Sequence, residues 1–435
     1  MTADLLLSYY GDDLTGSTDV MEAMELHGIA TVLFTDVPTE AQRRRFADCR
    51  VVGLAGTSRS QTPDWMDAHL PAAFGWLKGL GAPLCHYKVC STFDSAPHIG
   101  SIGRALDIGA AAFGQKATLL VVGAPELKRY TAFGQLFAGF RGENFRIDRH
   151  PVMRRHPVTP MDEADLRMHL GRQTEKRIGL VDLVAMRRPD AAEAIDAAME
   201  ASGVVLLDVV DAETQAAVGA QLWRLRERAS FVVGSSGVEY ALVAAGSGTP
   251  LAGRRREFAS PGARGAIAAV SGSVSPTTER QIRHALDHGF GGVALDPQRL
   301  TGGAAEAAIA DAVEAGSTVL GEGRSVVLYT AMGAGSASPE VVDGHRLGEG
   351  LGTVLDRLVR RHGLRRACVS GGDTSSHAIR ALGLHALQCV YPLPNAPGSP
   401  LCRGFSEDAA IDGLEITFKG GQVGTDGYFC EVRDT

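Results

Sequence analysis

The stretch DLLLSYYGDDLTGSTDVMEAMELHG, residues 4–28, decides the fold. Its apolar run Asp4–Tyr10 predicts a buried strand, and Asp19–His27 has the apolar spacing of a helix. Between them, Gly11–Asp19 combines glycines, hydroxyls and carboxylates, as a turn at the end of a strand does. Strand, polar turn and helix in this order are the beginning of a βαβ unit.

The same order recurs along the chain, with short apolar runs followed by helical patterns. Examples of predicted strands are Arg50–Ala55, Leu84–Val89, Ala117–Val122, Ala266–Val270 and Ala367–Ser370; examples of predicted helices are Pro63–Leu77, Thr277–His288 and Glu349–His362. Because most predicted strands are apolar throughout, both of their faces are expected to be covered. We therefore predict an α/β, Rossmann-like fold of mainly parallel sheets flanked by helices.

The length of 435 residues allows two to three domains. The segment Gly246–Gly265 is rich in Gly, Pro and Arg and has no apolar period, so it is the best candidate linker. We predict one domain at residues 1–245, a second at residues 266–435, and an interdomain cleft. The stretch Lys128–Pro160 has many Arg, His and Pro residues, and a loop of that length is usually functional or partly structured.

Composition narrows the class of protein. A net charge of −7 argues against nucleic-acid binding through a general basic field. The seven cysteines include no C-x-x-C pair, which is typical of core thiols in a reducing compartment. No window is apolar enough for a signal peptide or membrane helix, so we expect a cytoplasmic protein without a membrane partner. No pattern in the sequence predicts the oligomeric state, and a homodimer is compatible with it.

The turn after the first strand carries two adjacent carboxylates, Asp12 and Asp13. At the carboxyl end of a parallel strand, such a pair is placed to bind a polyol, hold Mg²⁺ or accept a proton. The simpler interpretation is that Asp13 or Thr15 only caps the following helix. Two acids flanked by glycines exceed what a cap needs, so we favour a functional role.

Two further strand ends carry positive charge. Arg59 follows the third strand, where a guanidinium could bind a carboxylate or phosphate, although a loop arginine is often only a surface charge. Lys88 ends the fourth strand, and a lysine there needs a charge partner such as Asp94 or one of the acids of the first turn. The alternative is a helix start with ordinary hydroxyl caps.

The second half of the chain is rich in glycine turns, three of them placed directly after strands. These turns are Ser271–Ser275, Met332–Ser336 (with Gly333 and Gly335), Ser370–Ser376 and Lys419–Gly424. Backbone N–H groups at helix starts attract phosphate, and glycine lets the backbone come close. Together the turns indicate a nucleotide's phosphates, although each alone is weak.

Several rival motifs are absent. Residues 109–116 resemble a P-loop, but the lysine comes one position late and precedes a strand. No G-x-G-x-x-G follows the first strand, which argues against a nicotinamide-dependent dehydrogenase. A non-catalytic sensor of sugar acids or nucleotides on the same scaffold remains the alternative from another class.

Five motifs in order resemble the four-carbon acid sugar kinase family across essentially the whole chain. They are GDDLTGSTD (11–19), YKVCSTFDS…GSIG (87–103), SGSVSP (271–276), SGGDTS (370–375) and KGGQVG (419–424). The resemblance implies a sugar-acid-binding domain, a nucleotide-binding domain, and transfer of phosphate from ATP to a terminal hydroxyl of a short acid. HPVTPM at His156–Met161 is similar to the oxo-tetronate kinase branch, and the subgroup most similar is the 3-oxo-isoapionate kinase type.

The resemblance also implies roles for residues. Substrate contacts are expected at Asp12, Arg59, Lys88, Ser91, Thr92, Asp94 and Ser95, and ATP contacts at Ser271, Gly272, Ser273, Gly333, Gly335, Gly371, Gly372, Asp373, Thr374, Lys419, Gly420 and Gly421. Mg²⁺ would bridge the phosphates, with Asp373 a candidate contact. We expect Asp12, Asp13, Lys88 and Asp94 to act in catalysis, and the sequence does not say which carboxylate is the base. Gly11 and the Gly16–Thr18 step depart from the commoner first motif, which puts the exact substrate in doubt more than the reaction.

Overall fold

The computed structural model describes residues 4–156, 158–251, 253–333 and 343–435. These residues form two compact units that alternate along the chain. The N-terminal unit holds the residues up to Asp12, Ala23–Thr31 and Thr39–Arg256, and the C-terminal unit holds Asp13–Glu22, Val32–Pro38 and Glu257–Thr435. Each unit is described below by itself.

The N-terminal unit is built on a parallel sheet with the strand order β3-β1-β4-β11-β5-β10-β9. The strands are β1 (Leu7–Gly11), β3 (Val51–Ala55), β4 (Leu84–Lys88), β5 (Thr118–Val121), β9 (Ile178–Val181), β10 (Val204–Leu207) and β11 (Phe231–Gly234). Most are buried along their whole length, as continuous apolar strands between two helical layers must be.

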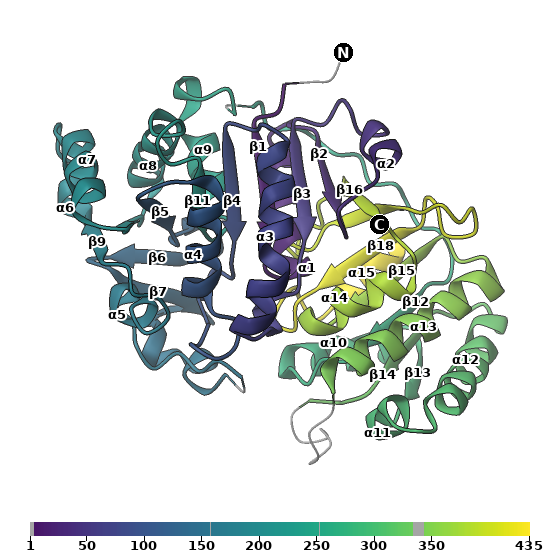
Figure 1. Ribbon diagram of the computed structural model, residues 1–435. Helices are drawn as coiled ribbons and strands as arrows, with labels where there is room; N and C mark the ends of the chain where they lie inside the picture. Colours follow the sequence, from purple (N-terminus) through teal and green to yellow (C-terminus); the bar gives the residue numbers. More distant parts are fainter. Residues whose placement is uncertain (1–3, 157, 252, 334–342) are drawn as a thin grey trace. The chain divides into compact units, whose positions relative to one another are not determined.

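Helices cover both faces of this sheet. On one face Phe231 of β11 contacts Phe74 and packs against Gly109, which come from α3 (Pro63–Gly79) and α4 (Ile102–Phe113). On the other face Gly234 of β11 lies against Val238 of α9 (Gly237–Ala244), which packs on α8 (Ala212–Arg224). Side chains alternate along a strand, so positions 231 and 234 face opposite helical layers. Smaller helices α5 (Leu166–Leu170), α6 (Leu183–Met186) and α7 (Ala191–Ala201) complete the unit (Figure 1).

The stretch at 128–160 contains a small antiparallel sheet of its own. Strands β6 (Arg129–Ala132), β7 (Gln135–Phe140) and β8 (Glu143–Arg146) pair in sequence order. The sequence predicts only an irregular stretch here, so this sheet is an addition to the expected parallel architecture.

The C-terminal unit has the strand order β13-β14-β12-β15-β18-β17-β16-β2. Its strands are β12 (Ala268–Ser271), β13 (Gly291–Ala294), β14 (Val326–Tyr329), β15 (Arg366–Ser370), β16 (Ala386–Tyr391), β17 (Leu401–Phe405), β18 (Glu415–Lys419) and β2 (Thr31–Phe34). The five strands from β13 to β18 are parallel, whereas β17, β16 and β2 join in antiparallel pairs. The fold is therefore α/β with a mainly parallel sheet, as predicted.

The helices of this unit also lie in two layers. One layer holds α11 (Pro297–Thr301), α12 (Ala305–Gly321), α13 (Gly344–His362) and α14 (Gly372–Ala381), and the other holds α10 (Pro276–Asp287) and α15 (Tyr428–Asp434) (Figure 1). A buried ion pair between Arg366 and Glu415 joins the first residues of β15 and β18. Polar side chains at the opposite ends of the same strands are described below.

Helix α1 (Leu14–Leu26) begins five residues before the helical pattern that the sequence shows. Asp13 explains the early start, because its carboxylate accepts the Gly16 N–H at 2.5 Å and its carbonyl accepts the Ser17 hydroxyl at 2.6 Å. The segment Gly253–Arg256, in the predicted linker, packs against the end of this helix: Arg256 pairs with Glu25 at 3.0 Å. The predicted linker therefore makes at least one defined contact with the N-terminal unit, through the exposed Arg256.

The seven cysteines, all in the described part of the chain, form no disulfide, and Cys49, Cys85, Cys368 and Cys402 are buried. Across the described ranges, no helix is long and apolar enough to cross a membrane.

Candidate functional site: two buried polar clusters

In the N-terminal unit, three strand ends meet at the carboxyl edge of the sheet. The Asp12 N–H donates to the Lys88 carbonyl at 2.9 Å, and the Arg59 N–H donates to the Asp12 carbonyl at 3.1 Å. Asp12 and Lys88 are 4% and 2% exposed, so both charged groups are held within the protein. The structure thus brings together the three residues that the sequence placed at separate strand ends.

Asp94 is the centre of this cluster. Arg59 donates from one guanidinium nitrogen to both Asp94 carboxylate oxygens, at 2.9 and 3.2 Å, and the Thr92 and Thr159 hydroxyls also donate to them. Burial alone would raise the pKa of Asp94, but Arg59, His156 and the Thr92 hydrogen bond outweigh it and hold the pKa below its usual range. Asp94 is therefore an ionised acceptor that is suited to hold Arg59 in place.

The loop after β4 is shaped by one unusual residue. Phe93 is fully buried and adopts a left-handed backbone with φ of 56°, a conformation that bulky residues rarely take. It separates Thr92 and Asp94, whose side chains interact directly. Ser95 is anchored elsewhere: its hydroxyl lies 2.9 Å from His169 Nε2 and accepts from Gln173. Ser91 is half-buried in the same loop.

Residues of the stretch at 128–160 complete the cluster, and none of them was predicted as a site residue. Thr159 contacts Asp94 at 3.2 Å and His156 Nδ1 at 3.1 Å. Arg129 is held by hydrogen bonds to the carbonyls of Leu127 and Lys128, while its buried Nε has no hydrogen-bond partner within the described ranges. Burial lowers the pKa of Arg129, and Cys90 and Asp94 oppose that shift. The sequence signals were the density of Arg and His in this stretch and the motif HPVTPM at His156–Met161, to which no role was assigned.

In the C-terminal unit, a row of polar residues ends three neighbouring strands. Ser271 of β12 is in register with Ser370 of β15, and Ser370 is in register with Lys419 of β18. All three are 0% exposed. Each continues into a turn, and we call Ser271–Ser275, Ser370–Thr374 and Lys419–Gly421 the glycine loops.

The glycine loops pack closely against one another. A Cβ added at Gly272 would lie 2.4 Å from the Thr374 hydroxyl, and one at Gly371 would lie 2.8 Å from it. A Cβ at Gly421 would lie 3.0 Å from the Ser273 hydroxyl. Gly371 also has φ of 122°, which L side chains rarely adopt. The close approach of these loops requires glycine, as expected for backbone that surrounds a phosphate.

The other residues that were predicted to contact the nucleotide differ in their burial and in their neighbours. Gly333 has φ of 80° and lies against Glu279 of α10, whereas Gly335 lies outside the described residues. Asp373 is exposed in the first turn of α14, and Gly372 is half-buried just before it. Gly420 accepts a hydrogen bond from the Lys419 ammonium at 3.0 Å.

Asp13 belongs to the C-terminal unit, whereas Asp12 belongs to the N-terminal unit. Within the C-terminal unit, the Leu14 N–H donates to the Ser376 hydroxyl at 3.2 Å, which ties the start of α1 to α14. Asp13 Oδ2 lies 3.8 Å from the Cβ position of Gly372, the first residue of α14. Asp12 therefore lies in the unit that holds the Asp94 cluster, and Asp13 lies in the unit that holds the glycine loops.

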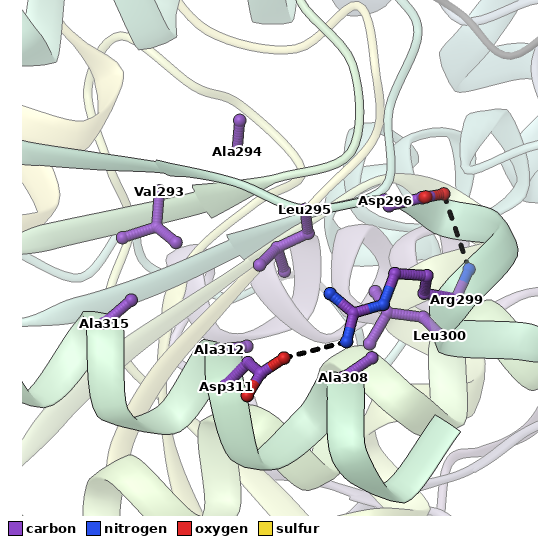
Figure 2. A pocket seen from close by; sticks show the side chains of 10 residues that line it. All are labelled: Val293, Ala294, Leu295, Asp296, Arg299, Leu300, Ala308, Asp311, Ala312 and Ala315. Atoms are coloured by element: carbon purple, nitrogen blue, oxygen red, sulfur yellow. Dashed lines mark hydrogen bonds and ion pairs between the residues drawn. The ribbon is translucent and has the colours of Figure 1, made fainter. Parts of the chain in front are cut away.

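A hollow of about 180 Å³ lies elsewhere in the C-terminal unit, between the end of β13 and helices α11 and α12. Figure 2 shows Arg299 reaching from α11 to Asp311 of α12, a contact of 2.8 Å, with Asp296 at the start of α11. Asp296 accepts from the backbone of Gln298 at 2.8 Å. The charged groups of this hollow are thus engaged with their own neighbours, and none of them is a predicted site residue.

No group of three or more His, Cys, Asp or Glu side chains with metal-binding geometry exists among the residues that the structure describes. Mg²⁺ in phosphoryl transfer enzymes is usually held by one or two carboxylates together with the substrate's phosphates. The exposed carboxylate of Asp373, beside the glycine loops, fits that arrangement.

Comparison with known proteins finds two domain models along the chain. Residues 7–242 match the model of a sugar-binding N-terminal domain, and residues 268–429 match that of a nucleotide-binding C-terminal domain. Fold and site therefore define a kinase that acts on sugar acids. The chain belongs to the four-carbon acid sugar kinase family.

Relatives that match over nearly the whole chain are named 3-oxo-isoapionate kinase or 3-oxo-tetronate kinase. The chain is 44% identical to the 3-oxo-isoapionate kinase of Paraburkholderia graminis, over 99% of this chain and 95% of the relative. It is 31% identical to the 3-oxo-tetronate kinase of Methylobacterium radiotolerans, over 99% of both chains. A solved structure from Salmonella typhimurium LT2 matches with a TM-score of 0.75 at 22% identity over 98% of both chains, which establishes the shared fold.

Proposed function

We propose that this protein transfers the γ-phosphoryl group of ATP to a terminal hydroxyl of a four- or five-carbon 3-oxo acid of the 3-oxo-isoapionate or 3-oxo-tetronate kind. The names of the full-length relatives support this substrate class. The observation that carries the proposal is the row Ser271, Ser370 and Lys419 beneath three glycine loops, because such backbone suits a polyphosphate.

The acid substrate binds at the cluster around Asp12, Arg59 and Lys88. Its carboxylate needs cationic partners, and Arg59, Lys88 and Arg129 all belong to this cluster. Asp94 fixes the Arg59 guanidinium, and Ser91, Thr92 and Ser95 shape the loop that carries Asp94. The overall charge of −7 is unfavourable for an anionic substrate, so this local positive charge matters.

The nucleotide binds at the glycine loops. The hydroxyl and N–H donors come from Ser271, Gly272, Ser273, Gly371, Gly372, Thr374, Gly420 and Gly421, and from Gly333 in the turn after β14. Bound Mg²⁺ would neutralise phosphate charge, and Asp373 is its expected protein contact. Phosphoryl transfer of this kind depends mainly on positioning and charge, with no covalent enzyme intermediate.

In the reaction, the substrate hydroxyl oxygen forms a bond to the γ-phosphorus while the bond from that phosphorus to the β–γ bridging oxygen breaks. ADP leaves, and the hydroxyl proton passes to a carboxylate. Asp12 and Asp13 are the candidates: Asp12 belongs to the sugar-side unit and Asp13 to the nucleotide-side unit.

The test is ADP release by the purified protein with ATP, Mg²⁺ and a panel of four- and five-carbon sugar acids and their 3-oxo forms. We expect ADP only with an accepted acid, and the highest kcat/KM with a 3-oxo acid. Equal ADP release with and without every acid would contradict the assignment of substrate. Binding of the acids without turnover would favour a sensor.

A further inference from the structure

Lys419 is a fully buried lysine of the C-terminal unit. It ends β18, is 0% exposed, and carries an ammonium group that must be desolvated. Within the described ranges no carboxylate lies within ion-pair distance of its Nζ. The ammonium instead donates to two neutral oxygens, Thr278 Oγ1 at 3.1 Å and the Gly420 carbonyl at 3.0 Å.

Among the residues that the structure describes, the groups that face Lys419 supply no negative charge at neutral pH. Cys368 of β15 and Tyr428 of α15 face it, and the Tyr428 ring lies 5.6 Å from Nζ. Burial raises the pKa of the Cys368 thiol to about 11 and that of the Tyr428 hydroxyl well above its usual value, so both stay neutral. Helix α10 contributes only the Thr278 hydroxyl.

Thr278 links the ammonium to the glycine loops. Its single hydroxyl proton is directed to Ser273 Oγ or to the Gly421 carbonyl, each 3.1 Å away. Because Lys419 occupies an acceptor position of Thr278, it fixes the Thr278 hydroxyl as a donor. A Ser273 oxygen that accepts from Thr278 keeps its own proton for a ligand, and successive hydrogen bonds of this kind strengthen one another.

We propose that Lys419 is a positioning residue whose buried charge, acting through Thr278 and Ser273, is balanced only when nucleotide phosphate occupies the glycine loops, so that nucleotide binding draws a proton onto Lys419. This inference rests on the proposed nucleotide site. Burial lowers the pKa of free Lys419 to about 8, with the nearby Cys368 opposing that shift, and an adjacent phosphate would raise it again. The uptake is therefore expected at mildly alkaline pH.

The test is isothermal titration calorimetry with ADP, without added metal, at pH 7 and pH 8 in buffers of different ionisation enthalpy. Wild-type protein should take up a fraction of a proton at pH 8 and less at pH 7. Lys419→Met should lose the uptake and bind ADP about 10- to 100-fold more weakly. Lys419→Arg, always charged, should bind ADP without the uptake.

Two further variants separate positioning from folding. Thr278→Ser should keep both affinity and uptake, whereas Thr278→Val should weaken ADP binding, and thermal melts would show that each variant is folded. Lys116→Met, at an exposed lysine of the other unit, is the matched control and should behave as wild type.

The outcomes distinguish the inference from the function on which it rests. Wild-type protein that binds ADP with no proton uptake at pH 8, or a Lys419→Met variant with unchanged uptake, overturns the inference alone. A wild-type protein that does not bind ADP overturns both.

Discussion

The two units treat a buried charge in opposite ways. In the N-terminal unit, the Asp94 carboxylate has its own counter-ion, Arg59, and two hydroxyl donors. In the C-terminal unit, the Lys419 ammonium has only neutral oxygens. A buried charge that already has a counter-ion mainly fixes the positions of the groups around it. A buried charge without a counter-ion favours the binding of a ligand of opposite charge.

The largest effect should come from the two carboxylates on either side of the unit boundary. Asp12→Asn should lower kcat by about 10²- to 10⁴-fold if Asp12 is the base, while the free energy of unfolding changes by less than about 1 kcal/mol. Asp13→Asn tests the nucleotide side, because Asp13 lies beside Gly372. Steady-state kinetics against each substrate, with urea unfolding as the control, assign the base. An Asp12 variant that loses stability in proportion to activity would favour a capping role.

Removing Arg59, the counter-ion of Asp94, tests the ion pair of the N-terminal unit. Arg59→Met should destabilise the protein by about 3 kcal/mol in urea unfolding, because it leaves the Asp94 carboxylate buried without its cation. Arg59→Met/Asp94→Asn should recover part of that loss.

The same pair gives a pH dependence with a defined sign. The folded-state pKa of Asp94 lies below the ordinary value of 3.8, so its stabilising effect is present above that pH and is lost as the pH falls through the folded-state pKa. The free energy of unfolding of Arg59→Met should therefore approach that of the wild type in strong acid. A constant difference would show that Arg59 acts only by packing.

For Lys419 the charged form of the side chain destabilises the folded protein, whereas for Asp94 the charged form stabilises it. Lys419 has a pKa lowered from 10.5 to about 8, so the folded state binds fewer protons than the unfolded state between these values. Stability of the nucleotide-free protein should therefore rise with pH in this window, by about 1–3 kcal/mol relative to Lys419→Met. Urea unfolding of both proteins across the window checks this. If the free energy of unfolding changed equally with pH in the wild type and in Lys419→Met, the pKa of Lys419 would not be lowered by folding and the contrast with Asp94 would be wrong.

The smallest effect concerns the close approach of the glycine loops. Gly421→Ala would place a methyl group 3.0 Å from the Ser273 hydroxyl and should weaken ADP binding by about 1 kcal/mol, with little change in stability. Gly75→Ala is the matched control, because Gly75 lies in α3 with open space at its Cβ. That control should stabilise the protein by about 0.5–1 kcal/mol and leave ADP binding unchanged.

Much of the parallel architecture was predictable because its strands are continuous apolar runs. The sheet β6–β8 was missed because its turns lack the usual Asn-Gly or Asp-Gly signal. Phe133–Gly134 and Arg141–Gly142 form these turns with positive φ at both positions, conformations that Phe and Arg seldom adopt.

The candidate site was predictable where its residues lie at the ends of strands: Lys88 and Ser271 are the last residues of β4 and β12, and Asp12 directly follows β1. Thr278 was missed because it lies within a helix, and Thr159 was quoted only as part of HPVTPM, with no site role. Their roles depend on contacts with residues far away in the sequence, Lys419 and Asp94, which no local pattern encodes.

The alternation of the two units along the chain has a consequence for synthesis. Strand β2 pairs with β16, and the Thr35 hydroxyl donates to the Leu384 carbonyl across a separation of 349 residues. At about 5–20 residues per second, the ribosome completes the C-terminal partners of this strand roughly 20–70 s after making it. During that interval β2 has no partner in its own unit, so the C-terminal unit can complete its sheet only after nearly the whole chain has been made.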